Sequence, residues 1–238
     1  MVHVCTDLRG RARRVWATLI LGCFFPWAAA IGVATDPQDW NGTWILDRDS
    51  VTSAAGAAHP VLTPAYRQRF DQWAHSLRDG TLRRASELFC QPPGMPALMR
   101  VTGFPVRVTV LADRVTTQHG AWAQQRTIYT DGRAQPAQLT PTDNGYTSGH
   151  WEGGTLVAQT IGLRADAELL AGVGHSSEAR VSERIYLASR DELVDEMTIF
   201  DARALEQPWP IRLRFKRSQA TLKPFACREA REPGTLRR

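Results

Sequence analysis

The sequence lacks the motifs that identify several large classes of enzyme. It has no Gly-x-Ser-x-Gly nucleophile elbow, no glycine-rich phosphate-binding loop with a lysine and no His-Glu-x-x-His zinc motif. Gly172-Val173-Gly174 does not have the strand–helix setting that a nucleotide-binding loop needs. The histidines after residue 34 are scattered without metal-ligand spacing. We therefore expect no metal site and no cofactor.

The first 34 residues have the three parts of a secretory signal peptide. Four arginines, an apolar run from Trp16 to Trp27 and a stretch of small residues follow one another. We predict cleavage after Ala30 or Ala34, a periplasmic or secreted protein, and contact with a membrane only during export. An uncleaved anchor helix is the alternative, but the run is short and contains Pro26. Lipoprotein anchoring through Cys23 is a further alternative, which the apolar residues beyond Cys23 disfavour.

Cysteine is scarce, with four in 238 residues, and two of these lie in the leader. The remaining pair, Cys90 and Cys227, indicates one disulfide in an exported chain. In the chain-entropy model such a long loop contributes about 4–5 kcal/mol. A catalytic thiol is the alternative, but no histidine is near either cysteine in the sequence.

Removing the leader lowers the formal net charge from +5 to about +2. Arg212, Arg214, Lys216 and Arg217 cluster on one predicted strand. Basic residues at such positions are typical of the solvated face of a strand, so we expect no nucleic-acid partner.

Residues 35–238 are expected to form a single domain that is mainly β. A helix is predicted at about 64–79, because Thr63-Pro64 resembles a helix start and Tyr66, Phe70, Trp73 and Leu77 share one helical face. Gly80 suits the helix end. The proline-rich segment from Cys90 to Pro96 is expected to be an ordered loop.

From Phe104 onward apolar residues recur at every second position, with turn residues between the runs. The expected inward faces include Val106 to Val110, Trp122 to Ile128, Val181 to Leu187 and Ile211 to Phe215. Many short strands joined by hairpin turns indicate an antiparallel barrel or sandwich. Trp40, Gly42 and Trp44 resemble the opening strand of lipocalins. We predict an antiparallel lipocalin-like β-barrel with one amphipathic helix before the main run of strands.

Most of the polar groups that suit chemistry lie between Arg126 and Thr160. The stretch holds an Asp-Gly turn at Asp131-Gly132, a proline-rich loop and a hairpin at Gly153-Gly154. His150 and Glu152 share one face of a strand, which makes them a possible general acid/base pair. Exposure of both at the barrel rim, with Trp151 packed inward, is the alternative. Tyr129 and Asp131 are further acid/base candidates.

A second candidate pair lies on apolar strand faces. Glu183 is between Val181 and Ile185, and Arg126 is between Trp122 and Ile128. A buried carboxylate needs a cation, so we predict an ion pair between Arg126 and Glu183. Such a pair is either structural or catalytic. The remaining predicted binding residues are Trp122, Trp151 and Arg133.

Six segments give the chain a resemblance to a family of secreted proteobacterial proteins, mostly of unknown function. They are Trp40–Trp44, Cys90–Pro96, Arg126–Arg133, Gly149–Val157, Glu183-Arg184 and Cys227–Glu229. The resemblance covers nearly all of residues 35–238 and implies export and a lipocalin-like barrel. The chain differs from the family pattern at Gln135, where histidine is common, and at Gly154, where an acidic residue is common.

Three functions fit these features. The first is an exported barrel that binds a hydrophobic or aromatic small molecule, since small barrels hold one ligand and six tryptophans follow the leader. The second is a cofactor-independent acid/base enzyme, an isomerase, cyclase, hydratase or lyase, on the same scaffold. Its catalytic candidates are Tyr129, Asp131, His150, Glu152 and Glu183. The third is a scaffold protein whose barrel is filled by side chains.

Overall fold

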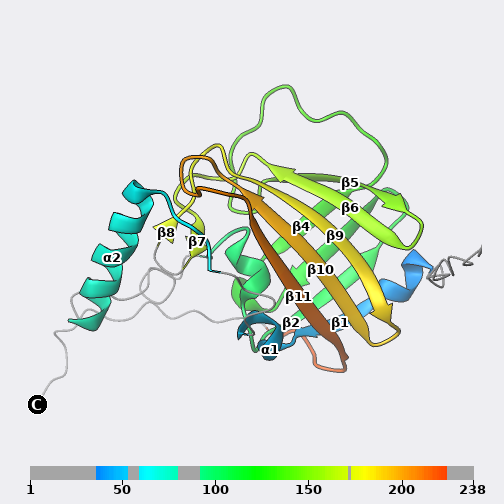
Figure 1. The fold of residues 1–238 in the computed structure, drawn as a ribbon. Helices are drawn as coiled ribbons and strands as arrows, with labels where there is room; N and C mark the ends of the chain where they lie inside the picture. Colours follow the sequence, from blue (N-terminus) through cyan, green and yellow to red (C-terminus); the bar gives the residue numbers. More distant parts are fainter. Residues whose placement is uncertain (1–35, 53–58, 80–91, 171–172, 224–238) are drawn as a thin grey trace, which may run out of the picture. The chain divides into compact units, whose positions relative to one another are not determined.

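The computed structural model describes residues 36–52, 59–79, 92–170 and 173–223. Nine strands close into a barrel in the order β1-β11-β10-β9-β6-β5-β4-β3-β2 (Figure 1). These strands are β1 (Gly42–Leu46), β2 (Pro105–Val110), β3 (Arg114–His119), β4 (Gln125–Tyr129), β5 (Tyr146–Glu152), β6 (Thr155–Ile161), β9 (Arg180–Ser189), β10 (Glu192–Phe200) and β11 (Trp209–Ser218). The predicted mainly-β, lipocalin-like barrel is confirmed.

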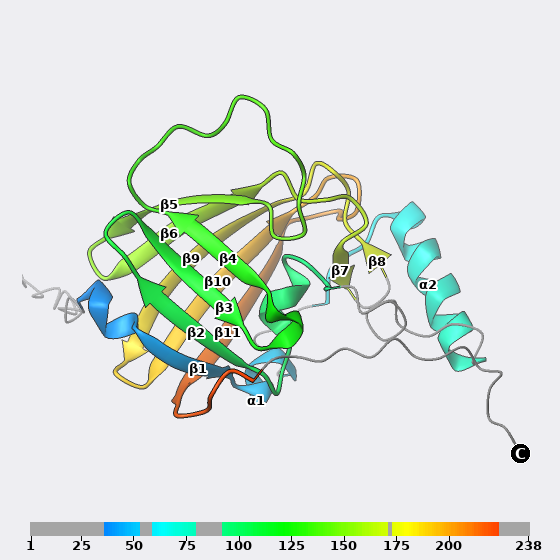
Figure 2. The same cartoon turned by 180° about the vertical axis from the view of Figure 1, so that it is seen from behind.

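One neighbouring pair departs from the antiparallel pattern. Eight of the nine pairs around the barrel are antiparallel, whereas β4 and β5 run parallel. Parallel neighbours need a crossover rather than a tight turn. The loop at 130–145 supplies it, and Figure 2 shows this loop extending away from the two strands that it joins.

The remaining elements are short, apart from one helix. They are η1 (Pro37–Trp40), α1 (Arg48–Thr52), α2 (Pro64–Arg78), η2 (Ala97–Arg100), η3 (Ala121–Ala123) and the two-stranded sheet of β7 (Glu168–Leu170) and β8 (Val173–Gly174). Within the described ranges, no helix combines the length and the hydropathy needed to cross a membrane.

Helix α2 matches the predicted helix, but the side chain of the residue before it does not cap the helix as the sequence pattern suggested. Thr63 is at the N-cap position and Pro64 follows it. The Thr63 hydroxyl donates to the carbonyl oxygen of Arg203 at 2.7 Å and makes no capping hydrogen bond. Thr63 therefore ties the start of α2 to the segment between β10 and β11. Gly80, the predicted helix end, lies outside the described residues.

The predicted strand at Trp122 is wrong, because the chain turns there. Trp122 and Ala123 have φ values of 49° and 50°, in the left-handed region that no strand uses. These residues form η3, and β4 begins only at Gln125. The alternation starting at Trp122 thus spans two different elements.

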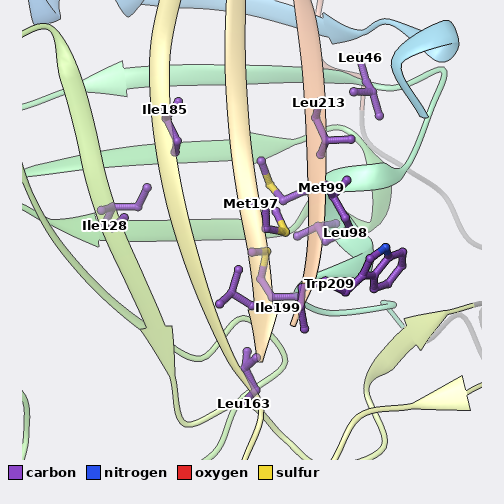
Figure 3. Close-up of a cluster of buried hydrophobic side chains, with 14 of the residues drawn as sticks. Leu46, Leu98, Met99, Ile128, Leu163, Ile185, Met197, Ile199, Trp209 and Leu213 are labelled. Atoms are coloured by element: carbon purple, nitrogen blue, oxygen red, sulfur yellow. The ribbon is translucent and has the colours of Figure 1, made fainter. Parts of the chain in front are cut away.

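Elsewhere the alternation predicts the buried faces correctly. On β9, Val181, Glu183 and Ile185 are buried, and β11 buries Ile211, Leu213 and Phe215. Figure 3 shows part of the resulting core, in which side chains of β9, β10 and β11 join Leu98 and Met99 from η2. A closed barrel pairs the backbone of every strand on both sides and leaves only the interior for apolar side chains.

The first strand contributes a large buried side chain. Trp44 is fully buried, and its indole Nε1 donates to the carbonyl oxygen of Trp40 at 3.0 Å. The guanidinium of Arg217 lies over its ring, 4.2 Å from the centroid. Trp44 thus fills space inside the barrel while its one polar atom stays hydrogen-bonded.

The proline-rich segment is ordered over residues 92–96, as predicted. Met95 is fully buried, and its amide donates to the carbonyl oxygen of Asp143 at 2.8 Å. Cys90 and Cys227 lie outside the described residues, as do residues 1–34. The disulfide and the signal peptide therefore stay predictions.

Candidate functional site

A group of polar side chains lies inside the barrel, where an apolar core is expected. Each occupies an inward-facing strand position, and neighbouring members are brought together by the strand register. We call this group the interior polar cluster; it consists of Thr117, His119, Arg126, Thr147, Thr160, Glu183 and Asp195. Buried polar groups on this scale are costly unless they bond to one another.

The centre of the cluster is the predicted ion pair, which the structure contains. Arg126 and Glu183 have side chains that are 1% and 0% exposed. Arg126 Nη1 donates to Glu183 Oε1 at 2.8 Å, and Nη2 donates to Oε2. The guanidinium also donates to Thr160 Oγ1 at 3.1 Å and to Thr147 Oγ1 at 3.4 Å. Burial alone would lower the pKa of Arg126, but the Glu183 carboxylate outweighs it and the pKa is raised.

Asp195, on the neighbouring strand β10, is buried without a donor. Neither of its carboxyl oxygens accepts a hydrogen bond from any described residue. Burial and the nearby negative charge of Glu183 raise the pKa of Asp195 well above its usual value. Asp195 therefore holds its proton to a higher pH than an exposed aspartate does.

His119 is the second group whose charge the interior suppresses. It is 3% exposed, and its Nε2 lies 3.2 Å from Thr117 Oγ1. Burial and the positive charge of Arg126 lower the pKa of His119 to about 3. The imidazole is thus neutral at ordinary pH, and the cluster holds one ion pair, a neutral histidine and a carboxyl group whose pKa is raised.

This shift predicts a pH dependence of stability. Because the folded pKa of His119 lies below its unfolded value near 6.5, the unfolded chain takes up a proton first as the pH falls. Stability should then be lost between pH 6.5 and 3, by at most about 1.4 kcal/mol per pH unit. His119→Gln should lack this part of the slope, measured by urea unfolding between pH 4 and 7. Asp195, whose pKa is raised, changes stability with pH in the opposite direction. It is present in both proteins, so its contribution cancels in the comparison. Equal slopes for the two proteins would contradict the prediction.

The interior cavity beside the cluster is small. Its volume is about 30 Å³, which is room for about two water molecules. Three members of the cluster line it, Thr117, Arg126 and Asp195. The rest of the lining is apolar and consists of Trp40, Trp44, Met99, Val106, Val108, Val115, Ile128, Leu156, Ile185, Leu193 and Phe215. The arrangement is a nearly filled apolar interior with a buried carboxyl group at its wall.

The hairpin candidates His150 and Glu152 lie on the outer surface. Their side chains are 64% and 49% exposed. His150 Nε2 is 3.2 Å from Glu152 Oε1, and Arg184 donates to Glu152 Oε2 at 3.1 Å. Arg184 and His150 lower the pKa of Glu152. The structure therefore agrees with the alternative in which both side chains are exposed at the barrel rim.

Tyr129, Asp131 and Arg133 form a separate group outside the barrel. Arg133 Nε donates to Asp131 Oδ1 at 2.8 Å, and its guanidinium lies 4.2 Å from the centroid of the Tyr129 ring. The hydrogen bond from Arg133 lowers the pKa of Asp131 to about 2. Tyr129 also stacks on Tyr146, with ring centroids 5.3 Å apart.

The two tryptophan candidates have different surroundings. Trp151 packs against the core and meets Trp40 edge to face, with centroids 4.9 Å apart. Trp122 is half-buried in η3. Of the sequence-predicted site residues that the structure describes, only Arg126 and Glu183 form an ion pair inside the barrel.

Asp195 was missed in the sequence, although a signal for it was present. Leu193, Asp195, Met197 and Ile199 occupy alternate positions, so a carboxyl group interrupts an apolar strand face. The same pattern identified Glu183. His119 and the three threonines also occupy inward positions. A histidine or threonine on a strand is less unusual than a carboxylate, so these positions are a weaker indication of a polar interior than Asp195 or Glu183.

The remaining sequence features are the basic residues of β11 and the histidines considered as metal ligands. The basic residues of β11 lie near acidic partners, for example Lys216 Nζ at 3.1 Å from Asp47 and Arg212 Nε at 3.6 Å from Glu196. In the part of the chain that the structure describes, no three His, Cys, Asp or Glu side chains gather as metal ligands would.

Comparison with known proteins adds no family to these observations. No protein-family model matches the sequence, and no curated protein matches it. The site therefore has to be interpreted from its own geometry.

Proposed function

We propose that the protein is an exported β-barrel that binds a mainly apolar small molecule through one polar group. A closed barrel of this kind is compatible with small-molecule binding. The observation that carries the proposal is Asp195, a fully buried carboxyl group at the wall of an apolar cavity, with no donor from the described residues. A buried polar group left in this state is costly, and a ligand that hydrogen-bonds it recovers that cost.

The small cavity sets a condition on binding. Ligand pockets usually measure about 300–1,000 Å³, far more than the 30 Å³ present here. A molecule of aromatic size therefore enters only if lining side chains move. Met99 is the most adaptable of them, because it is unbranched and has three rotatable bonds. We accordingly propose a site that opens on binding.

Export is the second part of the proposal. The leader pattern in residues 1–34 and the resemblance to secreted proteobacterial proteins support a periplasmic or secreted location. An apolar or aromatic molecule is the expected partner in that location, since the aqueous periplasm carries such molecules poorly without a binding protein.

Mass spectrometry tests the binding proposal. The mature protein is purified from the periplasm of a Gram-negative host and extracted with organic solvent. We expect one apolar molecule per chain in the wild-type extract and none in an extract of Asp195→Val. The variant should fold, because it removes a buried carboxyl group that has no donor. Empty extracts, together with a melting temperature that added indole or 1-naphthol does not raise, would contradict the proposal.

An acid/base enzyme is the second candidate, and the raised pKa of the buried Asp195 carboxyl group favours it. A carboxyl group whose pKa is raised by burial and by a neighbouring carboxylate is suited to donate a proton to a substrate. Asp195 would be the general acid, with Arg126 and Glu183 holding its surroundings in place. Asp195→Asn should then retain ligand binding and lose about 10²-fold or more in turnover of the extracted molecule. Unchanged turnover in this variant would leave binding alone.

A further inference from the structure

A second hollow lies outside the barrel, at the seam between β4 and β5. The two strands pair over only two positions, Ile128 with Thr147 and Tyr129 with Ser148. Before these positions, a side-chain amide replaces the backbone hydrogen bonds between the two strands. Asn144 Nδ2 donates to the carbonyl oxygen of Gln125 at 3.0 Å and to Gln124 Oε1 at 3.2 Å. The loop at 130–145 adjoins this seam (Figure 2).

The hollow at this seam, which we call the seam pocket, has the size of a ligand site. Its volume is about 390 Å³, within the usual range of about 300–1,000 Å³. It is lined by residues 124–127 and 142–147 together with Tyr129. The interior cavity is more than tenfold smaller, and Arg126 is the residue common to the two linings.

The lining of the seam pocket is polar and carries little free charge. Amide and hydroxyl side chains dominate it, including Gln124, Gln125 and Thr127. Its carboxylate, Asp143, pairs with Arg164, and the Arg126 guanidinium pairs with Glu183. Such a surface offers hydrogen-bond donors and acceptors but does not select an anion or a cation.

Two polar atoms of the lining lack a partner. Within the described residues, neither Asn144 Oδ1 nor the Tyr146 hydroxyl makes a hydrogen bond, although both atoms are buried. Buried polar atoms in native proteins are nearly always bonded, and both residues line the seam pocket, so a ligand bound there is a candidate partner for these atoms. The stacked rings of Tyr129 and Tyr146 add an aromatic edge to the same pocket.

We propose that the seam pocket binds a neutral saccharide. Each sugar hydroxyl both donates and accepts a hydrogen bond, which matches a lining of neutral amides and hydroxyls. The C–H groups of a pyranose ring pack against aromatic side chains, and the stacked pair of Tyr129 and Tyr146 supplies an aromatic edge. The absence of free charge in the lining disfavours phosphorylated or acidic ligands. This site is independent of the interior site proposed above.

Titration of the mature protein with maltose and with N,N′-diacetylchitobiose, followed by ligand-detected NMR, tests the proposal. We expect saturable millimolar binding of at least one of the two sugars. Tyr146→Phe should weaken it about fivefold, the loss of one neutral hydrogen bond, while leaving the ring stack in place. Tyr186→Phe is the matched control, because Tyr186 bonds to Glu196 and Arg212 on another part of the wall. It should bind as the wild type does.

Two results would overturn the saccharide site. One is the lack of saturable binding by either sugar, and the other is binding that Tyr146→Phe leaves unchanged. Asp195→Val should bind the sugar normally, because Asp195 lines only the interior cavity. Loss of the apolar ligand with retention of the sugar would therefore separate the two proposals, and either one can fail alone.

Discussion

Replacing Arg126 by methionine is expected to destabilise the protein by about 3–5 kcal/mol. The change leaves the Glu183 carboxylate buried without its cation and removes the donors that bond Thr147 and Thr160. Breaking a buried pair costs more than the pair itself contributes, because the remaining charge stays desolvated. Urea unfolding at pH 7 measures the loss as a lower midpoint at an unchanged slope.

The double variant Arg126→Met/Glu183→Met is the control. It removes both charges, so it should recover most of the lost stability, because exchanging a buried ion pair for apolar side chains of similar volume is close to neutral. Glu183→Gln alone should cost less than Arg126→Met. The positive charge of Arg126 lowers the pKa of Asp195, so Asp195 can ionise in this variant and replace the lost Glu183 carboxylate. A single Arg126→Met variant that loses less than about 1 kcal/mol would contradict the central role of this ion pair.

Truncating Trp44 to alanine is expected to cost about 3–5 kcal/mol. Trp44 is among the largest fully buried side chains and lines the interior cavity. The truncation loses apolar burial, the hydrogen bond to Trp40 and the contact with Arg217. Trp44→Phe keeps an aromatic ring in the same space and should lose less. Chemical unfolding of the two variants gives the comparison.

The same variant tests whether the barrel interior accepts an aromatic molecule. Trp44→Ala enlarges the 30 Å³ cavity by most of an indole ring, and apolar cavities of that size bind small aromatic molecules. Added indole should therefore raise the melting temperature of Trp44→Ala more than that of the wild type. Full stability of Trp44→Ala, without indole, would show that Trp44 does not support the core as its burial indicates.

The interior cluster and the seam pocket suit different chemistry. The interior offers a buried carboxyl group with a raised pKa among apolar side chains, but little volume. The seam pocket offers volume and neutral polar groups at the outer wall. An apolar ligand should therefore depend on Asp195, and a sugar should depend on Tyr146. Measuring both ligands on both variants assigns each site separately.

Local patterns in the sequence determined the architecture. The period of two on the runs that became β9 and β11 predicted which side chains face inward, and it placed Glu183 among them. Proline, glycine and the 3.6-residue period predicted α2 and the hairpin at Gly153-Gly154. The Arg126–Glu183 pair also followed, since a buried carboxylate needs a cation and Arg126 occupied an inward position.

Only the tertiary structure decided which groups meet. The left-handed backbone at Trp122, the parallel seam of β4 and β5 and the outward face of His150 depend on contacts between segments far apart in the chain. Asp195 became important because strand pairing sets it beside Glu183 and leaves it without a donor. Periodicity is a local property that fixes the face of each strand, whereas strand order and register are long-range properties that fix its neighbours.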